Sequence, residues 1–134
     1  MKLVCKKANL QNGVQIVSRA VPNKTTMSIL ECILIDASHN MITLTDNDMD
    51  LVNETIIQGE IKEEGLIAID AKIFLEIVRK LPDSDVKIET DSSYKVTITC
   101  EKAKFKIMRK TGENFSYLKK VKKKKIILIK HKTN

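Results

Sequence analysis

Phosphate binding is the chemistry that the charged side chains of this sequence suggest first. Two stretches, Lys7 to Lys24 and Ala71 to Pro82, together carry six basic residues and a single acidic one, Glu76. Both stretches read as helices, so the positive charges would lie on two helix faces and in the turns that follow, where they can meet a nucleic-acid backbone. DNA or RNA is therefore the candidate partner, and ordinary solvated helix faces are the alternative.

The net charge of +7 comes from the end of the chain. Residues 119–134 hold eight lysines and no acid, which leaves residues 1–118 with 16 basic and 17 acidic side chains. Outside the two basic stretches, the rest of residues 1–118 has a net charge of −6. We therefore expect the outer faces of the helices and the outer face of the sheet to differ in charge.

A run of aspartates imitates a calcium loop without completing it. Asp46, Asp48 and Asp50 match the first acidic positions, but Leu51 stands where such a loop needs glycine and Ile57 where it needs glutamate. We expect turn formation at Asp46 to Asp50 and no metal site.

The remaining reactive side chains predict no catalytic centre and no cofactor. His39 and His131 have no nearby cysteine and carboxylate that would suggest a triad. Cys5, Cys32 and Cys100 stand far apart, without a CxxC pair, which favours reduced structural thiols in a cytoplasmic protein. The 134 residues suit one domain, and we find neither a signal peptide nor a membrane span in the sequence.

The first half of the chain predicts a strand, a helix and three more strands. The helix has one apolar stripe, formed by Leu10, Val14, Val17 and Val21. Pro22 ends this helix, and Gly13 inside it costs about 1 kcal/mol relative to alanine, so the helix must rely on tertiary packing. The expected strands are Leu3 to Cys5, Ser28 to Ala37, Met41 to Thr45 and Leu51 to Gln58.

The second half repeats this order. Its predicted elements are the strand Leu66 to Ile69, the helix Ala71 to Leu81, and the strands Val86 to Glu89, Lys95 to Thr99 and Lys104 to Met108. Placing Arg19 and Pro22 over Arg79 and Pro82 gives a constant offset of 60 residues, which indicates an internal repeat. Two such βαβββ repeats would bury both helices on one face of a continuous antiparallel sheet, an α+β fold.

Several segments resemble one family in the right order and spacing. They are AVPNKTTMSILECIL from Ala20, LTDNDMDL from Leu44, IDAKIFLEIVRKLPD from Ile69 and GENF from Gly112. Together they resemble the first domain of the bacterial DNA sliding clamp, the beta subunit of DNA polymerase III, over residues 1–118. The resemblance implies two βαβββ repeats. It also implies a non-catalytic processivity factor in which three such domains form a subunit and two subunits, associated head to tail, close a ring around double-stranded DNA. The replicative polymerase and the clamp loader are the further partners that it implies.

The resemblance also suggests which residues would contact DNA. Lys24 and Lys72 fall where the family places DNA-contacting basic residues, with Arg79 as a third candidate and Arg19 as a fourth. A clamp must hold duplex without reading it, and phosphate contacts from a rigid wall satisfy that need. A solvent-facing side chain without a specific role is the alternative for each.

The last strand of the domain matches the subunit junction of the family. Its alternation puts Phe105 and Ile107 on one track and Lys104 and Lys106 on the other, so Lys104, Phe105 and Ile107 are the candidate interface residues. The alternative is that Phe105 and Ile107 belong to the core of the domain itself.

The chain departs from the family after the GENF motif. We interpret residues 119–134 as a basic tail, a remnant of the linker and of the first strand, Ile126 to Lys130, of a missing second domain. The sequence leaves open whether this is a fragment, an altered reading frame or a separate small protein. One domain would lack the partner pocket of the later domains and could not close the two-subunit ring. The alternative function is an independent small nucleic-acid-binding protein that acts through its lysine-rich tail.

Overall fold

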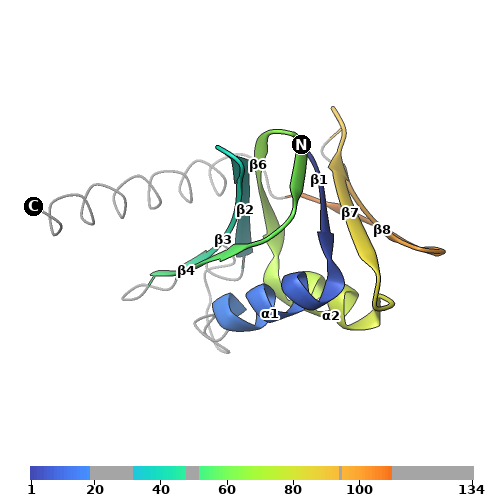
Figure 1. The fold of residues 1–134 in the computed structure, drawn as a ribbon, viewed down its shortest axis with the longest axis horizontal. Helices are drawn as coiled ribbons and strands as arrows, with labels where there is room; N and C mark the ends of the chain where they lie inside the picture. Colours follow the sequence, from blue (N-terminus) through green and yellow to red (C-terminus); the bar gives the residue numbers. More distant parts are fainter. Residues whose placement is uncertain (19–31, 48–51, 94, 110–134) are drawn as a thin grey trace, which may run out of the picture.

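Each half of the chain runs as a strand, a helix and three strands, in the order that the sequence predicts (Figure 1). The computed structural model describes residues 1–18, 32–47, 52–93 and 95–109. The first half contains β1 (Lys2–Lys6), α1 (Lys7–Ser18), β2 (Cys32–Ser38), β3 (Met41–Asn47) and β4 (Val52–Ile57). The second contains β6 (Gly65–Asp70), α2 (Ala71–Lys80), β7 (Asp85–Thr90), β8 (Lys95–Cys100) and β9 (Ala103–Met108). A short strand that the sequence reasoning missed, β5 (Glu60–Glu63), lies between the halves.

The strands form two antiparallel sheets, so the prediction of one continuous sheet is wrong. The five-stranded sheet has the order β5-β1-β7-β8-β9 and the four-stranded sheet the order β4-β3-β2-β6. The reason is an exchange between the halves: β1 pairs with β7 of the second half, and β6 pairs with β2 of the first. The apolar pattern identifies strands, but it does not say which half supplies the partner of each.

The two helices lie side by side on the same side of the molecule (Figure 1). Fully or almost fully buried side chains of α1, Leu10, Val14 and Val17, have counterparts 64 residues later in Phe74, Val78 and Leu81. The helices therefore superpose with an offset of 64, and the predicted offset of 60 is wrong. It rested on an Arg-x-x-Pro match, whereas burial gives the register that packing requires. Val21 and Pro22, the predicted end of the first helix, lie outside the described residues.

Gly13 lets α1 approach the four-stranded sheet closely. A Cβ atom built on this glycine would lie 2.5 Å from Cγ2 of Ile57 on β4 and 3.1 Å from Cδ1 of Leu44 on β3. The glycine thus lowers the intrinsic stability of the helix but permits close packing, and α1 depends on the tertiary structure as the sequence predicts.

Helix α2 has a well-defined start and end. Asp70 is its N-cap, and the carboxylate Oδ1 accepts a hydrogen bond from the backbone N–H of Ile73 at 3.0 Å. Leu81 takes an extended conformation at the other end, and Pro82 follows it. The predicted stop at Pro82 is confirmed.

Polar residues close the hairpins where the sequence places them. His39 and Asn40 take positive φ angles of 52° and 61° between β2 and β3. Asp91 accepts hydrogen bonds from the hydroxyl and N–H of Ser93 and from the N–H of Lys95, and these bonds lower the pKa of its carboxyl. Asp46 corrects one expectation, because it lies within β3 with its side chain buried and is not a turn residue.

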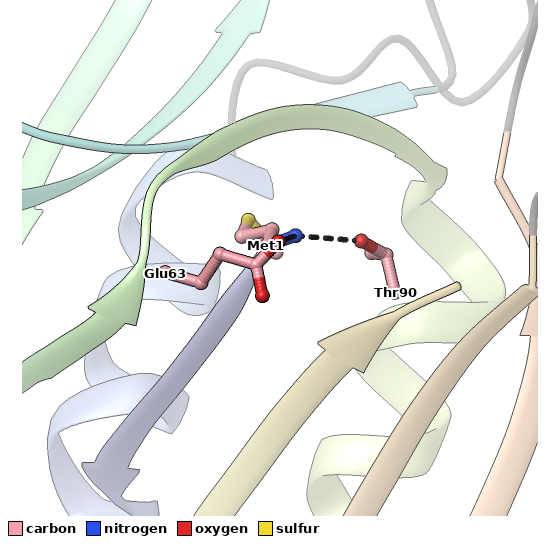
Figure 2. Close-up of polar contacts among 3 residues, drawn as sticks. All are labelled: Met1, Glu63 and Thr90. Atoms are coloured by element: carbon pink, nitrogen blue, oxygen red, sulfur yellow. Dashed lines mark hydrogen bonds and ion pairs between the residues drawn. The ribbon is translucent and has the colours of Figure 1, made fainter. Parts of the chain in front are cut away.

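Met1, just before β1, contacts one residue of β7 and one of β5, the two strands that flank β1 (Figure 2). The amino group of Met1 donates a 2.9 Å hydrogen bond to Oγ1 of Thr90, and it lies 3.7 Å from Oε1 of Glu63. The N–H of Thr90 in turn donates to the carbonyl of Met1 at 3.0 Å. These contacts hold β1 between β5 and β7. None of the helices in the described ranges is long and apolar enough to cross a membrane.

Candidate nucleic-acid interface

The exposed face of α2 carries most of the described helical charge. Lys72, Glu76, Arg79 and Lys80 are exposed and follow one another at intervals of four, three and one, so they share one side of the helix, opposite the buried Phe74 and Val78. Lys72 and Arg79 thus lie on the outward face of the helix, as the sequence predicts. Their contact with DNA remains a prediction. Lys24 and Arg19 lie outside the described residues.

The position of Lys72 is not explained by the stability of the helix. Arg79 and Lys80 lie in the last turn of α2, where the helix dipole favours positive charge. Lys72 lies in the first turn, which contains no acidic residue, and there the dipole disfavours a cation. The helix dipole therefore gives no stability reason for a lysine at this position, and a role of Lys72 in attracting a phosphate stays a prediction.

The exposed face of α1 is neutral. Its exposed side chains are Ala8, Asn12, Gln15 and Ile16, and Lys7 at its start is half-buried. Because α1 and α2 pack side by side, their outward faces form one surface that combines amide groups with three cations and one acid. Such a surface can attract phosphates and donate hydrogen bonds.

A second basic surface, which the sequence reasoning missed, lies on the five-stranded sheet. We call it the lysine face. It consists of the outward side chains Lys2, Lys6, Lys87, Lys95, Lys104 and Lys106, with Asp85 and Glu89 among them. The buried Ile88 and Ile98 of the same strands point to the other side. The expectation that the outer faces of the helices and of the sheet differ in charge is therefore wrong for this sheet, because both carry an excess of basic side chains.

Acidic neighbours partly neutralise the lysine face. Lys87 donates to the carboxylate of Glu89, and this bond together with the charges of Lys87, Lys2 and Lys104 lowers the pKa of Glu89. Glu89 pairs with Lys2 of β1 on one side and with Thr97 of β8 on the other, and Thr97 pairs with Lys106 of β9. Lys2 and Lys106 therefore lie in the same cross-strand row as Glu89. The period-two spacing of Lys104 and Lys106 is the sequence signal that could have revealed this face.

The candidate interface residues lie on the edge strand β9. Lys104 is exposed, whereas Phe105 and Ile107 are half-buried and pack against the main core. β9 pairs only with β8 among the described strands, so its outer edge presents backbone groups to a partner. The structure thus supports a core role for Phe105 and Ile107, and their role in an interface stays a prediction.

The buried thiols show no sign of nucleophilic chemistry. Burial raises the pKa of Cys5 to about 12, with a further contribution from the charge of Asp85. Burial also raises the pKa of Cys100. In the described ranges no three histidine, cysteine or acidic side chains are arranged to hold a metal ion.

Comparisons with known proteins identify relatives of the whole described region. The family model for the "DNA polymerase III beta subunit, N-terminal domain" matches residues 1–119. A "Beta sliding clamp" from Synechocystis is 32% identical over 96% of this chain and 35% of its own length. The crystal structure assigned to a DNA polymerase III beta subunit of Eubacterium rectale is 68% identical, with a TM-score of 0.82 over 86% of this chain and 31% of its own. The Helicobacter pylori beta clamp, solved with a DNA ligase peptide, is 26% identical with a TM-score of 0.78.

The comparisons agree with the repeat seen in the structure. Two helices packed against antiparallel sheets, in two βαβββ units, are the architecture that these solved structures share with this chain. The chain spans about a third of the length of the relatives that it matches.

Proposed function

The chain belongs to the DNA polymerase III beta subunit family, and from this premise we propose that it forms the amino-terminal domain of a DNA sliding clamp. In this proposal it is a non-catalytic part of the processivity factor of the replicative polymerase. It contacts the phosphates of double-stranded DNA without reading the bases. Residues 1–118 make up the domain, the tail 119–134 follows it, and the protein acts in the cytoplasm.

The observation that carries the proposal is the single wall formed by α1 and α2. Both helices face the same side, and α2 presents Lys72, Arg79 and Lys80 there. A wall of rigid helices keeps the cations at a fixed distance from a duplex. On the exposed side of the described α2, no aromatic side chain is available to stack on a base, and Arg79 is the only side chain that could make two hydrogen bonds to one base. Lys24 and Arg19 extend this surface in the proposal.

The edge strand β9 is the proposed junction with a neighbouring domain. Phe105 and Ile107 pack against the core on one side and remain half exposed, while Lys104 lies beside them. An incoming strand that pairs with β9 would cover the apolar pair, and an acidic side chain on that strand would pair with Lys104. Head-to-tail association through this edge, with the polymerase and the clamp loader bound by other domains, completes the proposed assembly.

Duplex binding by variants that lack basic side chains tests the proposal. The triple variant Lys72→Ala/Arg79→Ala/Lys80→Ala removes three cations from the helix wall. If these cations contact phosphates, the affinity for a short duplex falls and the slope of log K against log salt decreases by about 2 to 3. Fluorescence anisotropy at several salt concentrations measures both quantities.

The matched control removes the same charge from another surface. Lys87→Ala/Lys95→Ala/Lys106→Ala lowers the net charge of the lysine face by three and leaves the helix wall intact. We expect this variant to keep the salt slope of the unmodified chain. Equal losses in the two variants would contradict the proposal, because they would mean that the total charge and not the helix wall governs binding.

A further inference from the structure

The charge of the lysine face changes from one edge of the five-stranded sheet to the other. Inward side chains of this sheet, such as Ile88 and Ile98, belong to the core, and β7 and β8 lie on the side of the molecule opposite β3 and β4 (Figure 1). The edge strand β5 begins and ends with the exposed Glu60 and Glu63. By contrast, β8 and β9 contain no acidic residue. The charged side chains of the β8–β9 half of the face are therefore all basic.

The cations of this basic half recur at a regular distance. Lys104 and Lys106 are two residues apart on β9, which is about 7 Å along the strand. Lys95 of β8 pairs with Met108, so it lies one further step of about 7 Å in the same direction. All three lysines are exposed. Three successive rows of the sheet thus each present one cation.

Hydroxyl groups lie beside these cations. Thr97 pairs with Lys106 and Thr99 pairs with Lys104, and both threonines are half-buried next to the exposed lysines. A hydroxyl can donate a hydrogen bond to a carboxylate or accept one from a backbone N–H. The basic half of the face therefore offers a polypeptide both positive charge and hydrogen-bonding groups.

The lysine face already holds one carboxylate of its own. Glu89 accepts a hydrogen bond from Lys87. This bond, together with the charges of Lys87, Lys2 and Lys104, lowers the pKa of the glutamate. The charges of the face thus favour the ionised form of a carboxyl group that rests on it. Because Glu89 occupies Lys87, it also competes with any acidic ligand for this lysine.

We propose that the lysine face binds an extended polypeptide segment of a partner, with an acidic residue at every second position of that segment. Side chains on one side of such a segment are about 7 Å apart, which is the interval between the rows that hold Lys104, Lys106 and Lys95. A single-stranded nucleic acid fits this face less well. Sheet faces that bind one stack its bases on aromatic side chains, and none of the outward side chains of the described strands in this sheet is aromatic. The proposal goes beyond the proposed function and does not rest on it.

Nuclear magnetic resonance titration of the labelled full chain tests this proposal. The probe is a peptide of six Glu-Thr repeats, and the amide of Thr97 reports on binding at the face itself, separately from the lysine-rich tail. We expect this amide to shift at low salt. We also expect Lys87→Ala/Lys95→Ala/Lys106→Ala to weaken the affinity measured there by about fivefold or more. Absence of a shift in the unmodified chain would overturn the proposal.

Two matched variants complete the test. Lys72→Ala/Arg79→Ala/Lys80→Ala removes the same charge from the helix wall and should leave the affinity measured at Thr97 within about twofold. Glu89→Gln removes the competing carboxylate and should raise this affinity by about two- to threefold. Equal losses in the two triple variants, or weaker binding by the glutamine variant, would contradict the proposal.

The order of the acidic residues is tested with a second peptide, in which six threonines follow six glutamates. This peptide has the same composition and charge as the first, so equal affinity at Thr97 would mean that charge alone governs binding and would refute the proposed spacing. Shifts of the same amide with oligothymidylate or with phosphatidylserine vesicles, but not with the alternating peptide, would assign the face to a nucleic acid or to a lipid surface instead.

Discussion

Helices α1 and α2 occupy equivalent positions in the two repeats, yet among their described residues the fully exposed charged side chains all lie on α2. Leu10 and Val14 of α1 are as deeply buried as Phe74 and Val78 of α2. On the outside, α1 presents amides and α2 presents three cations and one acid. Core packing therefore explains why both inner faces are apolar. It does not explain why the outer faces of the two helices differ in charge. This difference is what directs attention to α2 as the proposed polyanion-binding surface.

The first prediction tests whether the inner faces are equivalent. Phe74→Ala should lower the free energy of unfolding by about 3 to 5 kcal/mol and Leu10→Ala by about 2 to 5 kcal/mol, because each leaves a cavity at a fully buried site. Urea denaturation followed by circular dichroism measures both. A loss below 1 kcal/mol for only one of them would break the equivalence of the two helices.

The second prediction sharpens the comparison at Gly13. Alanine favours the helix by about 1 kcal/mol, but its Cβ would lie 2.5 Å from Cγ2 of Ile57, which is attached to a branched and buried carbon. We expect Gly13→Ala to destabilise the protein by about 1 to 2 kcal/mol net. The matched variant Asn12→Ala, on the exposed side, should be neutral or slightly stabilising. A more stable Gly13→Ala protein would mean that α1 does not lie so close to β4.

The third prediction concerns the start of α2. Asp70→Ala removes the carboxylate that accepts from Ile73 N–H and should cost about 1 kcal/mol, whereas Asp70→Asn keeps an acceptor and should cost less. Thermal unfolding of the two variants measures the difference. Equal losses would indicate that the carboxylate has a role other than capping.

The sequence predicts the elements better than it predicts their partners. Apolar periodicity located both helices and eight of the strands, because Leu10, Val14 and Phe74 must face a core wherever the strands pair. The exchange of β1 and β6 between the sheets depends on contacts between residues 28 to 87 positions apart, which no local pattern encodes. The sequence did not predict β5 because this edge strand has a single apolar residue and so shows no apolar alternation.

The candidate site shows the same limit. Lys72 and Arg79 were identified from the basic charge of the stretch Ala71 to Pro82 and from the family resemblance, and the structure places both on the exposed side of α2. The lysine face was missed because its members come from β1, β7, β8 and β9, and only the pairing of these strands brings them together. Charge counted along the chain thus located one basic surface and concealed the other.

Nuclear magnetic resonance of the labelled chain with a short duplex tests the central claim most directly, because it locates the bound DNA on one of the two basic surfaces. The account predicts salt-sensitive shifts at the backbone amides of Lys72, Glu76 and Arg79, and at Asn12 on the adjacent helix. Shifts confined to Thr97, Lys104 and Lys106 on the lysine face would contradict it.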